Sequence, residues 1–401
     1  MPESIGLVLA GGGARGAYEV GVLSVLLPWL ERRHGQRPDV IVGTSVGALN
    51  TAYLAAHAHE DPATLSENAR RIWTEIGYRD VLAPLLSLGE LVAAGRVAIS
   101  LVFGGVAPIS LLDPAALAGT LARLIEFSDI HRNVADPQVR LRACAVVATA
   151  AHTNRSVVFH DGGRNPPSDM RRGIDYVRTE IANEHVRASA AIPVAFPAVD
   201  VRRPQPAEGS YFDGGTRLNT PIKPALRLQA RRVIVIGLNS LGPAPRSRQQ
   251  PDLFDGASQI VQGLLVDPVV HDVQTLATIN ETLSHGNGAT GGRRRRRIVP
   301  YIFIAPKTPN RIGEIARDVY RKHYAGLGGL RSRDLAAIGR LVGAGHSSIR
   351  GELFSYLFFA PEFAAALIEQ GRQDAQWWLE QEHHDGPWHV DNPPGAQGES
   401  A

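Results

Sequence analysis

The sequence has little of what marks several large classes of protein. A single cysteine, Cys144, among 401 residues excludes an internal disulfide framework and is typical of a reducing compartment. Cys144 lies in the apolar run 141–150, which favours a buried structural thiol. Aromatic residues make up only 6% of the chain and the net charge is only +3, so we expect no nucleic-acid binding.

Long apolar runs are also missing, and we expect no signal peptide. Residues 1–4 carry no basic region ahead of the first apolar run, so the pattern of a signal peptide is not present. The uncharged run 97–112 has 16 residues and contains Gly104, Gly105 and Pro108, whereas a transmembrane helix needs roughly 20 apolar residues. We therefore expect a cytoplasmic protein without signal peptide or transmembrane segment, whose contact with membranes would be peripheral.

The sequence does contain enough apolar material for a sizeable core. Hydrophobic residues make up 44% of the chain, which predicts one large domain with an appendage. Short apolar runs at 5–10 and 40–42 predict buried strands. Each leads through a glycine-containing turn into a predicted helix, 17–34 and 48–59, and Pro28 should kink or interrupt the first of them.

The turn after the second predicted strand, Gly43-x-Ser45-x-Gly47, has the pattern of a nucleophile elbow. A turn this sharp between a strand and a helix presents the serine hydroxyl and needs neighbours without side chains. The serine would also lie at a helix N-terminus, where unpaired N–H groups favour developing negative charge. Because the motif is short and frequent, it indicates a catalytic serine only with support from other segments.

The loop Gly11–Gly16, which follows the first predicted strand, allows two interpretations. Its spacing matches a dinucleotide-binding fingerprint, with Glu31 as the acidic partner, and would make the chain a nucleotide-binding oxidoreductase. Alternatively, the backbone N–H groups of Gly12 and Gly13 could hold the oxyanion of an acyl-transfer reaction. We favour the second interpretation, because the serine turn has a use only in a hydrolase. Arg15 could fix the loop, neutralise a substrate phosphate or be an ordinary surface charge.

A serine nucleophile needs a base, and two Asp-Gly-Gly motifs offer a carboxylate at a tight turn. Asp161 stands between a predicted strand and a polar stretch, and we interpret its motif as a plain hairpin turn, which Asp-Gly commonly forms. Asp213 follows the run 210–212 and is the stronger candidate for the base.

Four segments together resemble the patatin-like phospholipase family: Gly11–Gly16, Gly43–Gly47, Ala188–Pro197 and Asp213–Pro221. They occur in that family's order, and the resemblance spans about residues 4–240. It implies an α/β fold, namely a three-layer α/β/α sandwich with a mainly parallel central sheet. It also implies the hydrolysis of acyl esters in a lipid or phospholipid substrate, with no cofactor and no metal in any step.

The resemblance implies roles for individual residues as well. Ser45 would be the nucleophile, Asp213 the base of a Ser–Asp dyad, and Gly12 and Gly13 the donors of the oxyanion hole. The supporting positions of these motifs are Gly11, Arg15, Gly16, Gly43, Gly47, Gly214 and Gly215. These roles make the chain a carboxylic ester hydrolase of the phospholipase A, lysophospholipase or lipase type.

A dyad without histidine sets a requirement on its aspartate. A free aspartate has a pKa of about 3.9 and is a poor acceptor for a serine proton. We therefore predict that Asp213 is removed from water, which raises its pKa, and lies within hydrogen-bond reach of Ser45. A downstream histidine could instead complete a conventional triad, but the candidates lie in segments without recognisable supporting residues: His271, His285 and His323.

The remaining segments complete the expected organisation. A catalytic domain, 4–240, is followed by a loop, helix and added strand of the same domain, 241–310. A helical C-terminal extension, 311–383, and a flexible tail, 384–401, come last. Further elements are predicted over shorter ranges: helices at 62–77, with Asp61 as N-cap, at 113–127 and at 256–285, and strands at 141–150, 156–160, 233–238 and 298–305.

Two segments keep alternative interpretations. The apolar stretch 81–112 is either a core-facing helix or an apolar lid beside the serine. A run of basic residues is either simply solvated or in peripheral contact with an anionic membrane: Arg293, Arg294, Arg295, Arg296 and Arg297.

Overall fold

The computed structural model describes residues 3–82, 115–193, 196–240, 242, 267–285, 297–326, 328, 332–344, 348–381 and 386–391. Four sequence predictions fall largely or partly outside the described residues. They are the apolar stretch 81–112 beyond residue 82, the arginines 293–296, the first part of the helix predicted over 256–285, and the tail 384–401 except for residues 386–391.

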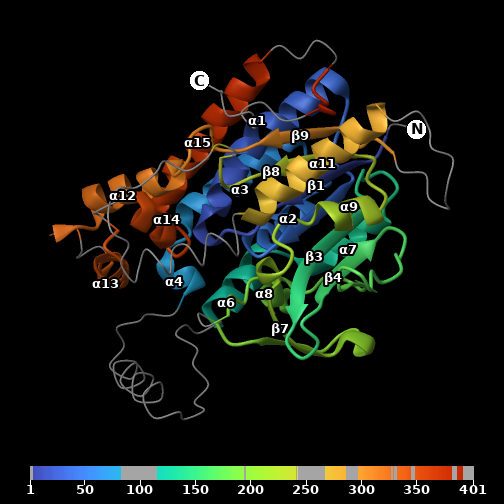
Figure 1. The fold of residues 1–401 in the computed structure, drawn as a ribbon. Helices are drawn as coiled ribbons and strands as arrows, with labels where there is room; N and C mark the ends of the chain where they lie inside the picture. The colour runs from blue at the N-terminus through green and yellow to red at the C-terminus, as the bar shows by residue number, and fades with distance from the viewer. Residues whose placement is uncertain are drawn as a thin grey trace.

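A single sheet forms the centre of the fold (Figure 1). The described part of the chain contributes nine strands to it, seven of them in the order β5-β4-β3-β2-β1-β8-β9. The run from β3 to β9 is parallel throughout, β4 is antiparallel to β3, and the short β7 pairs antiparallel with both β3 and β6. The strands are β1 Ile5–Leu9, β2 Val40–Thr44, β3 Ala143–Ala150, β4 Ser156–Gly162, β5 Ile174–Arg178, β6 Val199–Val201, β7 Gly209–Asp213, β8 Arg232–Ile236 and β9 Tyr301–Ile304.

Helices cover both faces of this sheet, which confirms the expected three-layer α/β/α arrangement. Side chains alternate along each strand, so Leu7 and Leu9 belong to one apolar layer and Val8 to the other. The first layer is completed by α1, α2, α3, α7, α8 and the C-terminal helices, and the second by α9 and α11. Burial on both faces explains why these strands are continuous apolar runs.

The helices have the following bounds: α1 Gly16–His34, α2 Val46–Ala56, α3 Pro62–Glu75, α4 Tyr78–Val81, α6 Ala115–Leu124, α7 Phe127–Ala135, α8 Asn183–Ser189, α9 Ile222–Arg227, α11 Asp267–His285, α12 Arg311–His323, α13 Arg333–Val342, α14 Ser348–Ser355 and α15 Pro361–Glu380. Short 3₁₀ turns lie at Gly13–Arg15, Gln205–Ala207 and Gly214–Thr216. Within the described ranges, no helix has the length and apolar character needed to cross a bilayer.

The predicted helical C-terminal region is packed onto the helices of the N-terminal part of the chain. In Figure 1, α15 lies beside α1, and the two helices are in direct contact. The buried Tyr18 hydroxyl of α1 donates a 2.9 Å hydrogen bond to Asp374 of α15. Within the tail expected to be flexible from residue 384, His389 forms a β-bridge with Tyr301 at the start of β9.

Most of the predicted elements are present, but the structure also contains elements that were not predicted, among them β5, β6, α8 and α9, and it differs in the following points. The helix α1 continues past Pro28 to His34, so the expected interruption is not found. The helix α7, Phe127–Ala135, was not predicted. The hairpin interpretation of Asp161 is wrong: this residue lies inside β4, and β4 continues into a parallel neighbour, β5, which requires a crossover. The predicted N-cap is confirmed, because the Asp61 carboxylate accepts from two N–H groups of the first turn of α3.

Candidate active site

The site forms where two strands meet end to end along one edge of β3. The strand β2 runs parallel to β3 and ends with Thr44 opposite Val147. The strand β7 runs antiparallel to β3 and ends with Asp213 opposite Ala148. The next residue of β2 would occupy the place that Asp213 already fills, so the chain must turn out of the sheet at Ser45. Ser45 and Asp213 are brought together in this way.

The turn at Ser45 has the geometry of a nucleophile elbow. Ser45 has backbone angles of φ 55° and ψ −125°, and α2 begins at the next residue. A side chain at Gly43 would clash with the Gly47 backbone, and one at Gly47 with the backbone of Leu9. Each glycine of the motif therefore permits a close approach of main chains. The positive φ of a non-glycine residue is backbone strain of the kind that is found at functional sites.

Ser45 and Asp213 are joined by a short hydrogen bond inside the protein. The Ser45 hydroxyl donates to Asp213 Oδ2 at 2.6 Å, and the Gly215 N–H donates to Asp213 Oδ1 at 2.6 Å. The Asp213 side chain is buried, with 3% of its surface exposed. Burial raises the pKa of Asp213 to about 7, and the two hydrogen bonds oppose that rise only in part. The carboxyl is thereby poised near neutral pH.

A second serine supports the turn from behind. Ser189, the last residue of α8, accepts a 2.9 Å hydrogen bond from the Ser45 N–H and donates to the Val147 carbonyl at 2.6 Å. Its hydroxyl thus pairs two main-chain groups that β2 leaves behind where it departs from β3. Ser189 lies in the segment Ala188–Pro197 that contributed to the resemblance, but no sequence pattern predicted this role.

The glycine loop lies directly against Ser45. A side chain on Gly11 would clash with Asn219 and crowd Cβ of Ser45. Gly13 has φ +58°, and a side chain there would clash with the Tyr356 carbonyl. Within the described part of the chain, the Gly12 and Gly13 N–H groups donate to no protein acceptor. Two unpaired main-chain donors therefore stand in the loop beside the serine.

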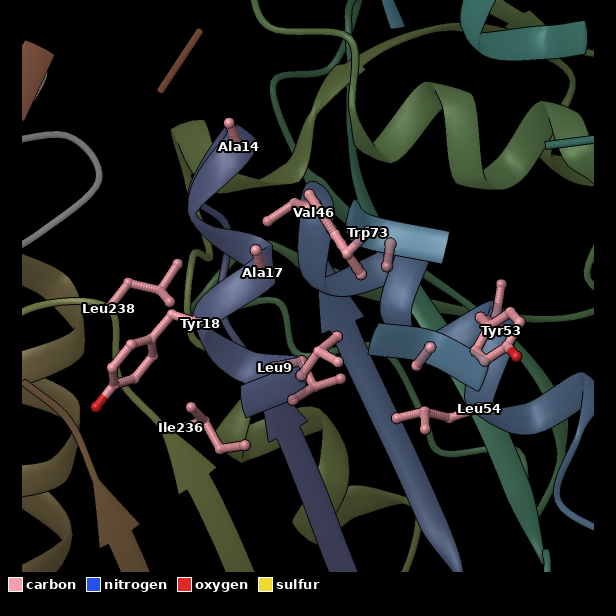
Figure 2. Packing of buried hydrophobic residues seen from close by; sticks show 14 of the residues in the cluster. Leu9, Ala14, Ala17, Tyr18, Val46, Tyr53, Leu54, Trp73, Ile236 and Leu238 are labelled. Carbon is pink, nitrogen blue, oxygen red and sulfur yellow. The ribbon is translucent and has the colours of Figure 1, made fainter. Parts of the chain in front are cut away.

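The first turn of α1 is sealed by residues of two other helices. A side chain at Gly16 would clash with Val46 of α2 and press on the ring of Trp73 of α3. Figure 2 shows Val46 and Trp73 beside the first turn of α1, near Ala17. In a dinucleotide fingerprint the second glycine lets the pyrophosphate approach, and here the Tyr356 carbonyl occupies the space beside that glycine, Gly13.

Arg15 is a buried group, so the surface-charge interpretation is wrong. Its side chain has no exposed surface and pairs with Glu352 at 2.5 Å. Glu31, the acidic residue of the nucleotide interpretation, lies at the other end of α1 and pairs with Arg37. No carboxylate is therefore supplied by Glu31 near the loop, and the nucleotide-binding interpretation is not supported.

Two buried groups beside the site went unpredicted. Glu19 is buried in α1 and accepts from Asn50 of α2 at 2.7 Å, and Asn50 in turn accepts from the Trp73 indole at 3.0 Å. Burial raises the pKa of Glu19 to about 8. The only signal in the sequence was an acidic residue within an otherwise apolar helix start, and such a residue is normally exposed.

The other titratable residues that the sequence singled out lie away from the serine. Asp161 pairs with His131 of α7 at 3.1 Å. Cys144 is fully buried, as expected, and burial raises the pKa of its thiol. His271 and His285 belong to α11, which packs on the other face of the sheet from α2. His323 is the last residue of α12.

An apolar cavity of about 50 Å³ lies one turn along α2 from Ser45. Leu49 and Tyr53 of α2 form one wall, and Trp73 of α3 forms another. Leu121 of α6 and Phe359, from the connection between α14 and α15, close it. Its lining is almost entirely apolar, which suits a hydrocarbon group and not a nucleotide.

The sequence was compared with protein-family models and with known proteins. A family model described as "Patatin-like phospholipase" matches residues 7–226. Lysophospholipase nte1 of Aspergillus terreus is 48% identical over 60 residues, which are 15% of this chain and 4% of that protein.

Two solved structures are similar at low identity. VipD from Legionella pneumophila is 13% identical with a TM-score of 0.34, over 94% of this chain and 66% of that one. Human GIVD cytosolic phospholipase A2, in complex with methyl gamma-linolenyl fluorophosphonate, is 13% identical with a TM-score of 0.32, over 93% and 59%. The chain thus spans a small part of the first relative and less than two thirds of these structures. On the match of the family model over more than half of its residues, the chain belongs to the patatin-like phospholipase family.

Proposed function

We propose that the chain is a serine hydrolase of fatty-acyl esters in lipids, of the phospholipase A, lysophospholipase or lipase type. The observation on which this rests is the buried 2.6 Å hydrogen bond from the Ser45 hydroxyl to Asp213, at a strained strand-to-helix turn. Membership of the patatin-like phospholipase family supports a lipid as the substrate. The small cavity beside α2 has an apolar lining, which supports an apolar group next to the site.

The proposed reaction has two halves. The Ser45 oxygen attacks the ester carbonyl while its proton passes to Asp213, and the N–H groups of Gly12 and Gly13 hold the oxyanion. The carbon–oxygen bond to the alcohol then breaks, and the alcohol leaves with the proton from Asp213. Water attacks the acyl-enzyme, Asp213 takes a proton from it, and the collapse of the second oxyanion releases the fatty acid. Ser45 recovers its proton from Asp213.

Burial suits Asp213 to both halves of this cycle. A carboxyl with a pKa of about 7 accepts a serine proton far better than one with the ordinary value of 3.8. It also gives the proton up readily to a departing alkoxide. The hydrogen bond from the Gly215 N–H holds the other carboxylate oxygen, so the accepting oxygen keeps its direction toward Ser45.

Contact with a membrane surface is a separate part of the proposal. Of the arginine run, only Arg297 lies in the described residues, and its guanidinium donates to the Ala230 carbonyl. That arginine is held on the protein, so an electrostatic contact with anionic headgroups would depend on its four neighbours.

The test is fatty-acid release from phospholipid and lysophospholipid vesicles by the purified protein, followed by chromatography across pH 5 to 9. We expect release, with kcat/KM rising through an apparent pKa near 7, because only the ionised Asp213 can accept the serine proton. An ordinary exposed aspartate would already be ionised at pH 5, and the profile would be flat there. Absence of release, together with saturable binding of a nicotinamide nucleotide, would overturn the proposal.

Replacement of the downstream histidines tests the dyad against a triad. We expect His271→Ala, His285→Ala and His323→Ala each to keep kcat within a few-fold of the wild type, because both Asp213 carboxylate oxygens are taken by Ser45 and Gly215. Loss of a triad histidine would instead lower kcat by about 10⁴-fold or more. Steady-state kinetics on a soluble short-chain ester, with circular dichroism to check folding, separates the two mechanisms.

A further inference from the structure

The partners of Arg15 all come from beyond the part of the chain that the family model matches. The model ends at residue 226. The guanidinium donates from Nε to the Ser355 hydroxyl at 2.7 Å and from Nη1 to Asn239 at 3.2 Å. From Nη2 it donates to the carbonyl of Glu352 at 2.6 Å and to its carboxylate at 2.5 Å. The hydrogen-bond acceptors of this buried cation therefore come from later segments, chiefly α14.

Glu352 is itself held from two sides. One carboxylate oxygen receives Arg15, and the other accepts a 2.7 Å hydrogen bond from the Gly313 N–H in α12. The side chain is buried together with Ser355, and the Tyr356 ring lies under the guanidinium, 3.9 Å from its carbon. A buried charge pair with its remaining donors and acceptors satisfied has one stable geometry, and removal of one partner leaves the other charge uncompensated.

The main chain of the loop is held by Tyr356 and by a hydrogen bond within the loop. The Tyr356 carbonyl accepts a 3.0 Å hydrogen bond from the Ala14 N–H and sits where a side chain on Gly13 would be. The Arg15 N–H donates to the Gly12 carbonyl at 3.2 Å. Because a peptide unit is planar and trans, fixing the Gly12 carbonyl fixes the opposite direction for the Gly13 N–H. Two successive peptide planes of the loop thus have set orientations.

We propose that α14 and Tyr356 hold the shape of the loop Gly11–Gly16 through Arg15, which makes Glu352 a positioning residue for hydrolysis. This rests on the proposed function where it concerns the reaction, and on the contacts alone where it concerns the loop. It assigns Arg15 to the support of the loop and removes it from the groups that could meet a substrate phosphate. It also makes the C-terminal helical region a required part of the site.

The test compares Glu352→Gln with a matched control, Asp374→Asn. Both replace a buried carboxylate of the C-terminal helices that is bonded to the N-terminal segment, but Asp374 contacts Tyr18 of α1 and not the loop. The glutamine cannot accept from both Arg15 and Gly313 through two oxygens. We expect kcat on a soluble ester to fall roughly 10- to 100-fold with KM little changed, because misplaced oxyanion donors act on the transition state. The control should keep kcat even if its melting temperature drops equally.

A second readout is independent of activity. Hydrogen exchange of the peptide that covers residues 11–16 should accelerate in Glu352→Gln and stay unchanged in Asp374→Asn. Unchanged exchange, or equal losses of kcat in both variants, would overturn the proposal. If the wild type hydrolyses no ester but exchange still accelerates, the proposed function fails and the support of the loop stands. Should Glu352→Gln not fold, Ser355→Ala, which removes one bond to Arg15, is expected to give a smaller change in the same direction.

Discussion

Replacement of Ser45 with alanine is expected to lower kcat by roughly 10⁴- to 10⁶-fold and to abolish labelling by a fluorophosphonate probe. The loss is large because the Ser45 oxygen forms the bond to the acyl group, and no other group of the site can replace it in the first half of the reaction. The probe reports the same property, since it phosphonylates a serine whose proton an adjacent base removes. Gel fluorescence and mass spectrometry of the labelled peptide measure the result.

A buried serine elsewhere provides the matched control. Ser66 of α3 is equally buried and donates to the Pro62 carbonyl, and within the described residues it has no carboxylate partner. Ser66→Ala should therefore keep both labelling and hydrolysis. Labelling that persists in Ser45→Ala would place the nucleophile elsewhere and contradict the proposed reaction.

The backbone strain at Ser45 can be tested by comparing the stability of two variants. Ser45 holds a positive φ of 55°, which an alanine would keep and a glycine would adopt without penalty. We expect Ser45→Gly to be more stable than Ser45→Ala by about 1–3 kcal/mol. Equal melting temperatures of the two inactive variants would show that the turn stores no such strain.

The strand and the turn around Ser45 could be predicted from the sequence, because the contacts that determine them involve residues close together in the chain. A β-branched run before Gly43 predicts a buried strand, and the glycines around Ser45 are needed by close main-chain contacts within a few residues. Asp61 and the following proline predicted the start of α3 for the same reason. Such signals require no knowledge of distant segments.

The pairing of Ser45 with Asp213 is a different kind of property. The two residues are 168 positions apart, and they meet because β2 and β7 end against the same edge of β3. No periodicity in the sequence specifies that register, so the pairing could be expected only from the resemblance. The hairpin prediction at Asp161 failed for the related reason that Asp-Gly indicates a turn but not which strand follows it.

Arg15 marks the limit of prediction from a single sequence. A sequence does not distinguish a buried arginine from an exposed one. The partners of Arg15, Glu352 and Ser355, lie 337 and 340 positions further along the chain. Arginine is rarely buried without a partner, so only the tertiary contacts could reveal which case applies. Ser189 was missed for the same reason, because its two hydrogen bonds reach Ser45 and Val147 in other segments.

Replacement of Asp213 with asparagine should lower the activity and, above pH 7, raise the free energy of unfolding. The variant is expected to lose about 10⁴-fold in kcat, because an amide cannot accept the serine proton. Above pH 7, however, it should be more stable than the wild type. The folded pKa of Asp213, about 7, lies above its ordinary value of 3.8, so the folded state binds more protons than the unfolded state between these values.

The sign of this effect gives a sharp test. The wild type should lose stability through Asp213 as pH rises from about 4 to about 7, by up to about 4 kcal/mol, and no further above that range. Glu19, whose pKa is also raised, contributes to both proteins alike, so the difference between their unfolding free energies isolates Asp213.

Urea unfolding at pH 5, 6, 7 and 8 measures that difference, and Asp161→Asn, from the second Asp-Gly-Gly motif, serves as the control for hydrolysis. Asp161 is also buried but pairs with His131 and not with Ser45, so its variant should keep hydrolysis. If the difference between Asp213→Asn and the wild type did not grow from pH 5 to 7, the aspartate would have an ordinary pKa. It would then be too weak a base for the reaction proposed here, because a serine proton passes efficiently only to an acceptor whose pKa is close to the working pH.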